Sequence, residues 1–189
     1  ARSTTVNQLV DAAGKLSQNR KGALIVVDLG SDLRPEDFLY SGINIEAQLS
    51  TDLLINLFAT DTPLHDGAVL VKGNKIISAG VILPLSRQGI SRYGTRHLAA
   101  LGITERFDRC ICIVVSEETG TLSLANQGKL ERPITSSRLQ ELLIELGENQ
   151  SPFGIPKSSS NKINPSQKIK TNDNITIKNK LDKQNTIQD

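Results

Sequence analysis

Two continuous apolar segments constrain the fold of this chain more than any other feature. Residues 22–29 read GALIVVDL and residues 109–116 read RCICIVVS, and both are rich in β-branched side chains. A strand with one face in solvent alternates between polar and apolar residues, whereas a strand covered on both faces reads as an unbroken apolar run. The two segments therefore predict buried strands inside a sheet.

Helical and strand patterns alternate along the rest of the chain. An apolar stripe with helical spacing spans residues 4–18, and leucines repeat in the same way from residue 136 to 147. This order predicts one α/β domain of α+β-like character, with a central mixed β-sheet flanked by helices. The other predicted features are a strand at 43–49, a helix from 51 capped by Ser50, strands at 68–72 and 75–85 joined at Gly73-Asn74, a helix at 95–107 broken near Gly102, a hairpin turning at 126–128, and a helix cap at Thr135 or Ser136.

The composition changes near residue 148. We place the folded domain at residues 1–147 and expect the polar, Lys- and Asn-rich segment 148–189 to be disordered, because it has too little apolar surface to offset its ordering entropy. After residue 156, seven lysines stand against three aspartates, a net +4, so the rest of the chain carries about −2 of the overall +2. With 3% aromatic residues and no Trp, the folded part is not expected to bind nucleic acid.

Cysteine usage and hydropathy indicate a cytoplasmic protein. Cys110 and Cys112 alternate with Ile in the second apolar segment. Two cysteines do not make a disulfide framework, so we expect both to be reduced core residues. No apolar run reaches the ~18 residues of a membrane helix, and we expect this chain itself to be soluble.

The segment His65-Asp66-Gly67-Ala68 precedes a predicted strand. A carboxylate suits Mg²⁺ or Mn²⁺, and an imidazole suits Mn²⁺ better. The small residues at 67 and 68 would let a ligand approach the backbone. The alternative is a turn in which Asp66 caps the backbone and Gly67 adopts a positive φ.

The segment Gly94-Thr95-Arg96-His97 opens a predicted helix. Free N–H groups and the helix dipole favour an anion at a helix start, and three consecutive side chains add hydrogen-bond donors. The alternative is a capping threonine with two solvated neighbours. Both histidines of the chain lie in these two segments, which favours a functional interpretation.

The segment Ser116-Glu117-Glu118 follows the second apolar strand. Strand ends in mixed sheets commonly point into clefts, where a carboxylate would share a metal and a serine would donate to a phosphate. The alternative is an acidic turn leading into Thr119-Gly120.

The segment Leu83-Pro84-Leu85 ends the strand that starts at Lys75. Its apolar side chains and free backbone groups would clamp a flat purine. The alternative is ordinary punctuation, since proline is common at strand ends.

Four stretches of the sequence together resemble one known family. LHDGAV, GTRH, ALGITE and VVSEETG occur in the order and at the spacing of the diadenylate cyclase domain, and the resemblance covers roughly Val6 to Leu146. The chain most resembles the membrane-anchored type, in which transmembrane helices precede this domain. The resemblance thus implies the cytoplasmic domain of a bacterial membrane-anchored protein, with membrane contact only through an anchor upstream of Ala1.

The resemblance also implies an activity. Members of the family are nucleotidyltransferases that condense two ATP into the second messenger cyclic di-AMP and release two pyrophosphates. The implied mechanism is metal-assisted in-line attack of a 3′-hydroxyl on an α-phosphate, with Mn²⁺ or Mg²⁺ as the cofactor. Because one site holds one ATP, the resemblance implies a face-to-face homodimer.

The family's motifs imply roles for particular residues of this chain. The implied catalytic residues are Asp66, Arg96 and His97. The implied metal ligands are His65, Asp66 and Glu118. The implied ATP-binding residues are Gly67, Ala68, Leu83, Thr95, Arg96, His97 and Ser116.

One position departs from the family's pattern. The family has Arg-His-Arg, and Leu98 replaces the second arginine here. If that arginine contacts phosphate, its loss removes a charge-assisted hydrogen bond of about 1.5–3 kcal/mol. The alternative function is therefore a catalytically weak or inactive nucleotide-binding signalling module.

Overall fold

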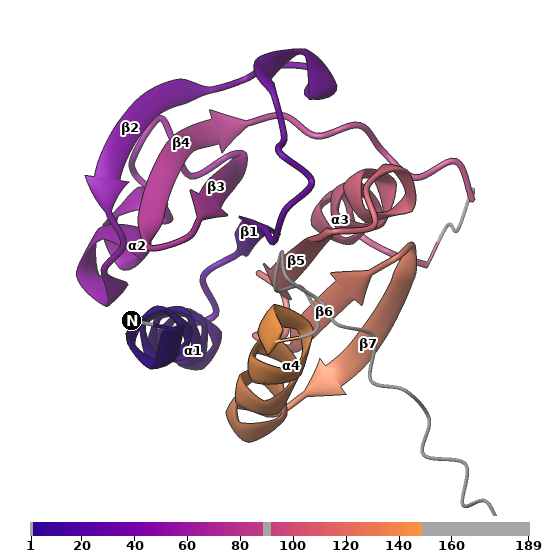
Figure 1. The fold of residues 1–189 in the computed structure, drawn as a ribbon. Helices are drawn as coiled ribbons and strands as arrows, with labels where there is room; N and C mark the ends of the chain where they lie inside the picture. Colours follow the sequence, from indigo (N-terminus) through magenta and orange to yellow (C-terminus); the bar gives the residue numbers. More distant parts are fainter. Residues whose placement is uncertain (1, 89–91, 149–189) are drawn as a thin grey trace, which may run out of the picture. The chain divides into compact units, whose positions relative to one another are not determined.

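The computed structural model describes residues 2–88 and 92–148. A mixed sheet forms its centre and helices pack on both faces, which confirms the predicted fold class (Figure 1). The predicted tail lies outside the described residues, apart from its first residue. The helices are α1 (Arg2–Gln18), the short 3-10 helix η1 (Pro35–Asp37), α2 (Thr51–Leu57), α3 (Thr95–Arg106) and α4 (Ser136–Glu148). The strands are β1 (Ala23–Asp28), β2 (Ile43–Gln48), β3 (Ala68–Lys72), β4 (Lys75–Val81), β5 (Cys110–Val115), β6 (Leu122–Asn126) and β7 (Lys129–Ile134).

The sheet is built around the two apolar segments. Its seven strands lie in the order β2-β4-β3-β1-β5-β6-β7. β1 runs parallel to β3 and antiparallel to β5, and the other neighbouring pairs are antiparallel. Every residue of β1 and of β5 is buried. Because these strands are covered on both faces, neither sequence alternates between polar and apolar residues.

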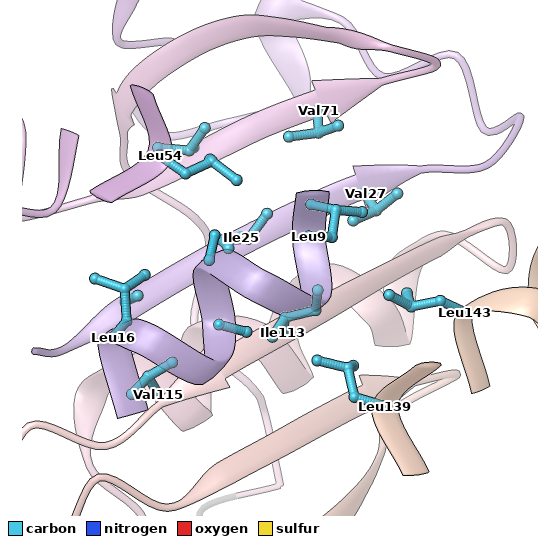
Figure 2. Close-up of a cluster of buried hydrophobic side chains, with 14 of the residues drawn as sticks. Leu9, Leu16, Ile25, Val27, Leu54, Val71, Ile113, Val115, Leu139 and Leu143 are labelled. Carbon is cyan, nitrogen blue, oxygen red and sulfur yellow. The ribbon is translucent and has the colours of Figure 1, made fainter. Parts of the chain in front are cut away.

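Alternate residues of β1 belong to two separate cores. Ile25 and Val27 pack in the core that α1, α2 and α4 cover, and Figure 2 shows Leu9 of α1 in the same cluster. Leu24 and Val26 point to the other face, which α3 covers. Burial of apolar surface on both faces stabilises the sheet, and it fixes the register of its central strand.

The predicted core cysteines are confirmed. Cys110 and Cys112 are both free and fully buried in β5, in the core that α3 covers. Burial raises the pKa of the Cys112 thiol well above its ordinary value. A thiol that stays protonated is a poor nucleophile and a poor metal ligand. Full burial in this core makes both cysteines packing residues.

Short-range signals set several element ends as predicted. Ser50 Oγ accepts a hydrogen bond of 3.1 Å from the backbone N–H of Leu53 at the start of α2. Thr135 Oγ1 likewise accepts a bond of 3.1 Å from a backbone N–H at the start of α4. In the turn between β6 and β7, Gln127 and Gly128 have φ of 48° and 70°. Two successive positive φ angles are typical of a type I′ hairpin turn.

The predicted break near Gly102 is wrong, because α3 runs through this residue without interruption. Gly102 is buried, and a Cβ on it would lie 2.6 Å from the carbonyl carbon of Leu85 and closer still to the carbonyl oxygen of Pro84. Glycine here allows a helix to pack against backbone, which is a tertiary reason that helix propensity does not reveal. The strand predicted over 75–85 is also too long, since β4 ends at Val81.

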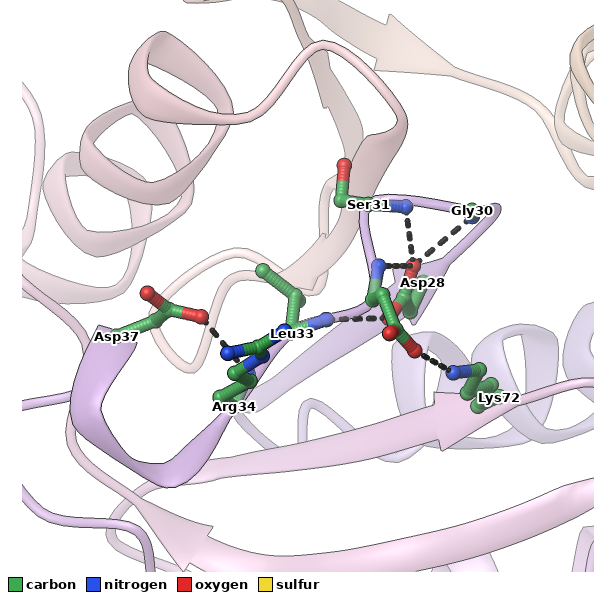
Figure 3. Close-up of polar contacts among 8 residues, drawn as sticks. Asp28, Gly30, Ser31, Leu33, Arg34, Asp37 and Lys72 are labelled. Carbon is green, nitrogen blue, oxygen red and sulfur yellow. Dashed lines mark hydrogen bonds and ion pairs between the residues drawn. The ribbon is translucent and has the colours of Figure 1, made fainter.

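A buried carboxylate closes the carboxyl end of β1 (Figure 3). Asp28 is 5% exposed. Its oxygens accept hydrogen bonds of 2.9, 2.8, 3.3 and 2.8 Å from the backbone N–H groups of Gly30, Ser31, Asp32 and Leu33. Asp32 in turn forms an ion pair with Lys72 of β3. At this end of the sheet, Asp28 therefore holds the loop of residues 30–33 in place.

Candidate active site

The opposite end of the sheet brings the sequence motifs together. Strand register pairs Ala23, the first residue of β1, with Val115, the last residue of β5. It also pairs Ala68, the first residue of β3, with Val81, the last residue of β4. Because β1 and β3 are parallel, all four of these residues lie at the same edge. The segments 65–68, 83–85 and 116–118 therefore adjoin strand ends at that same edge.

His65 and Asp66 form a polar pair in front of β3. His65 Nδ1 lies 2.6 Å from the carbonyl oxygen of Thr62, and because a carbonyl only accepts, Nδ1 carries a proton. The other ring nitrogen, Nε2, lies 3.3 Å from Asp66 Oδ1. The Asp66 side chain is 78% exposed and that of His65 is 26% exposed. The site thus presents a carboxylate oxygen and an imidazole nitrogen side by side at the surface.

Gly67 and Ala68 are small because of protein packing. A Cβ on Gly67 would lie 2.7 Å from the carbonyl carbon of Gly80 in β4, and Gly67 does not adopt the positive φ of the turn alternative. Ala68 is fully buried in the core under α3. Their implied contact with a nucleotide stays a prediction, and backbone atoms would have to make it.

The start of α3 reaches the same edge. Gly94 is the N-cap residue and makes no side-chain cap. Thr95, the next residue in the sequence, is exposed. The Arg96 guanidinium forms an ion pair with Glu117, with Nη1 and Oε2 2.9 Å apart. A Cβ on Gly22 would lie 2.6 Å from Arg96 Cζ, so the guanidinium lies over the backbone that enters β1. An uncapped helix start beside a guanidinium favours an anion.

His97 points into the protein. Its residue exposure is 5%, and Nε2 has no hydrogen-bond partner among the described residues. Burial lowers the pKa of His97 below its ordinary value, and the positive charges of Arg132 and Arg96 lower it further. The ring is therefore neutral at pH 7, and it stacks on Tyr93. Its implied contact with phosphate stays a prediction.

Ser116 and Glu118 lie in the turn after β5. The Ser116 N–H donates to the carbonyl oxygen of Thr121 at 3.0 Å, and its Oγ accepts from the N–H of Thr119 at 3.3 Å. These hydrogen bonds are the ones expected if the segment is an acidic turn leading into Thr119-Gly120. They do not use the Ser116 hydroxyl proton, which a ligand could accept. Glu118 is exposed. The implied roles of both residues stay predictions.

The metal ligands implied by the family do not form a complete cluster in the part of the chain that the structure describes. No three His, Cys, Asp or Glu side chains gather there closely enough to hold a metal. His65 and Asp66 are adjacent, whereas Glu118 does not join them in such a group. A metal at this edge would need further ligands from water or from nucleotide phosphates, as is common for Mg²⁺.

Leu83 and Leu98 mark two contacts between the segment 83–86 and α3. Leu83 is 3% exposed and packs in the core under α3. Leu98 is half-buried, and its carbonyl oxygen accepts a hydrogen bond of 2.9 Å from the N–H of Ser86. The backbone of the first turn of α3 therefore fixes the segment that follows Leu83, and contact between Leu83 and adenine stays a prediction.

Comparison with known proteins identifies the family. The sequence profile described as "DisA bacterial checkpoint controller nucleotide-binding" (DAC) matches residues 10–130. The chain belongs to the diadenylate cyclase (DAC) domain family. It is 41% identical over 145 residues to cyclic di-AMP synthase CdaA of Bacillus subtilis, covering 76% of this chain and 52% of the relative. It is 47% identical over 132 residues to a diadenylate cyclase of Listeria monocytogenes, covering 69% and 47%. The DAC chain thus spans about half the length of these curated relatives.

Solved structures also resemble this DAC domain. A double mutant of DacA from Staphylococcus aureus has a TM-score of 0.69 and 37% identity, over 77% of this chain and 96% of that one. A protein described as a hypothetical membrane spanning protein from Bacillus cereus has a TM-score of 0.63 and 41% identity, over 68% and 63%. Within residues 2–88 and 92–148, no helix is long and apolar enough to cross a membrane.

Sequence reasoning missed three residues around the start of α3 in this DAC domain, namely Gly22, Tyr93 and Arg132. Gly22 could have been found, because a glycine directly before a buried strand often marks a close approach of another group. Tyr93 belongs to no recognised motif. Arg132 comes near Tyr93 only through the pairing of β5, β6 and β7, which the local pattern does not reveal.

Proposed function

We propose that this chain is a diadenylate cyclase, an enzyme that condenses two ATP molecules into cyclic di-AMP and releases two pyrophosphates. Membership of the DAC family and similarity to a relative named cyclic di-AMP synthase support the activity. The observation that supports the proposal is that the His65–Asp66 pair and the Arg96-bearing start of α3 lie at the same edge of the sheet. The edge combines a carboxylate with an anion-binding element, and phosphoryl transfer needs both.

In the proposed reaction, the 3′-hydroxyl oxygen of one ATP attacks the α-phosphorus of the other. A new P–O bond forms, the bond to pyrophosphate breaks, and the carboxylate of Asp66 accepts the hydroxyl proton. Arg96 and the N–H groups at the start of α3 offset phosphate charge. No covalent intermediate with the protein is needed, so positioning and charge neutralisation supply the catalysis.

His65 and Asp66 fit a divalent metal. Since Nδ1 of His65 faces a carbonyl, Nε2 is the ring nitrogen that would bind a metal, and it lies beside a carboxylate oxygen. One imidazole and one carboxylate suit Mn²⁺ better than Mg²⁺. When bound, such a metal would lower the cost of forming the attacking alkoxide.

We propose that a face-to-face dimer is the active species. Joining two ATP molecules requires two sites that face each other, and a two-fold axis provides them with one surface on each protomer. The exposure of Asp66 supports this arrangement, because the carboxylate is open to a facing molecule. By analogy with the Bacillus cereus protein described as membrane spanning, we further propose that an upstream anchor holds the domain at a membrane.

Product formation tests the function directly. The protein is incubated with ATP and Mn²⁺, and cyclic di-AMP is sought by chromatography. Asp66→Asn should abolish turnover without changing the melting temperature, because Asp66 is exposed. Asp61→Asn, at another exposed aspartate five residues earlier, is the matched control and should behave like the parent. Absence of product at high enzyme concentration, with ATP binding intact, would count against the proposal.

The second candidate is a nucleotide-binding module with little or no synthesis, and the leucine at position 98 favours it. This residue is half-buried at the first turn of α3, where an arginine would bring one more positive charge. Leu98→Arg separates the two candidates. A large gain of product over a silent parent would support the module, whereas an active parent supports the enzyme.

A further inference from the structure

Three side chains from separate elements stack behind the start of α3. Tyr93, in the segment before the helix, lies with its ring centroid 6.1 Å from that of His97 and an angle of 24° between the ring planes. The guanidinium carbon of Arg132 in β7 lies 5.8 Å from the centroid of Tyr93. Both distances fall in the ranges of offset aromatic stacking and cation–π contact. We call these residues the Arg132–Tyr93–His97 stack.

The charge state of His97 suits this stack. Burial and the charges of Arg132 and Arg96 lower the pKa of the ring, so it is neutral at pH 7. A neutral imidazole stacks on tyrosine without repelling the two arginines, whereas an imidazolium would repel both. His97 therefore serves here as an aromatic contact and not as a cation.

The stack flanks the residues that would receive phosphate. Gly94 is the N-cap residue of α3 and has no side chain, so the N-cap residue itself donates and accepts no side-chain hydrogen bond at the start of the helix. Tyr93 precedes the segment 94–96 and His97 follows it, and the two rings contact each other across that segment. A group that receives an anion works best when its donors are held in place before the anion arrives.

We propose that Tyr93 and Arg132 are positioning residues for ATP, which hold the start of α3 through the Arg132–Tyr93–His97 stack so that Thr95 and Arg96 receive the phosphates. The inference rests on the proposed function. Neither residue touches the reacting atoms. Arg132 of β7 thereby brings a positive charge near the start of α3. The helix itself has Leu98 at the position where the family's pattern has its second arginine.

Histidine titration by NMR tests the stack independently of activity. The chain has two histidines, so a His65→Gln variant assigns the signals of His97. Arg132→Gln should raise the pKa of His97, because a nearby positive charge is removed. Tyr93→Ala should shift the His97 ring resonances and also raise the pKa, because the ring becomes hydrated. Tyr93→Phe keeps the aromatic ring and should retain the parental signals.

Kinetics then test the positioning role. Tyr93→Ala and Arg132→Gln should each raise the KM for ATP about tenfold, the loss expected for one stacking contact. Tyr93→Phe should restore the parental KM. Arg138→Gln is the matched control, because Arg138 is an exposed arginine that pairs with Glu131 beside Arg132. It should change neither the KM nor the titration of His97.

The outcomes separate this inference from the proposed function. In a parent that makes cyclic di-AMP, an unchanged KM in Tyr93→Ala and Arg132→Gln would overturn the positioning role and leave the enzyme in place. In a parent without product, an unchanged His97 titration in Arg132→Gln would overturn the stack itself. Arg132 is exposed, so this variant should fold even if Tyr93→Ala does not.

Discussion

Asp28 binds four consecutive backbone N–H groups at the end of β1. Hydrogen bonds to a charged acceptor are each worth about 1.5–3 kcal/mol, and buried donors left without a partner add a further cost. Asp28→Ala should therefore lower the free energy of unfolding by about 3 kcal/mol or more. Urea denaturation followed by circular dichroism measures this change.

The control for Asp28 is its neighbour Asp32. The Asp32 side chain is exposed and pairs with Lys72 at the surface, where ion pairs contribute little to stability. Asp32→Asn keeps a residue that tolerates the positive φ of 56° found there. It should leave the urea midpoint nearly unchanged. An equal loss in both variants would contradict a special role for the buried carboxylate.

His97 should make the stability of the domain depend on pH. Burial lowers its pKa in the folded state from an ordinary value of 6.5, so the unfolded chain binds the proton more tightly. The resulting stability is fully present above pH 6.5 and is lost progressively as the pH falls below that value. Urea midpoints between about pH 7.5 and 5 should fall in the parent and fall less in His97→Gln. His65→Gln, which retains His97, should follow the parent. Equal slopes in all three proteins would contradict the pKa direction.

At the scale of elements, two helical glycines differ in what surrounds them. Gly102 in α3 packs against the backbone of Pro84 and Leu85, whereas a Cβ on Gly147 in α4 would meet nothing within 4 Å among residues 2–88 and 92–148. Alanine is favoured over glycine in a helix by about 1 kcal/mol. Gly147→Ala should therefore raise the free energy of unfolding by about 0.5–1 kcal/mol.

The same change at Gly102 should have the opposite sign. Its new methyl group would overlap backbone that cannot move like a side chain, and overpacking of this kind costs about 1–3 kcal/mol or more. Thermal melting of both alanine variants measures the contrast. Because the displaced segment follows Leu83, ATP binding should also weaken in Gly102→Ala. Equal stabilisation at both positions would mean that α3 does not approach this segment.

At the scale of the whole molecule, the sequence predicted the strands and helix starts that depend on a few neighbouring residues. The unbroken apolar segments predicted β1 and β5, and Ser50 and Thr135 marked helix starts, because capping and burial act over a few residues. The meeting of the motifs at one edge depends on strand order, which long-range packing decides. The contact between Arg132 and Tyr93 has the same origin. Hydrophobic periodicity could have revealed neither the meeting of the motifs nor the contact between Arg132 and Tyr93. The family's motifs indicated only the meeting of the motifs.

Whether one protomer is enough for the proposed reaction is also a question about the whole molecule. A reaction that joins two ATP molecules, each held by a different protomer, needs both protomers in one complex. Below the dissociation constant of the dimer, the rate per protomer should therefore rise in proportion to protein concentration, and above it the rate should level off. Deletion of the residues after Gln150 should leave this curve unchanged, since every residue of the candidate site lies between positions 65 and 118. Product assays at saturating ATP, paired with light scattering at each concentration, measure the dependence. A constant rate per protomer where scattering finds only monomer would contradict the dimeric mechanism.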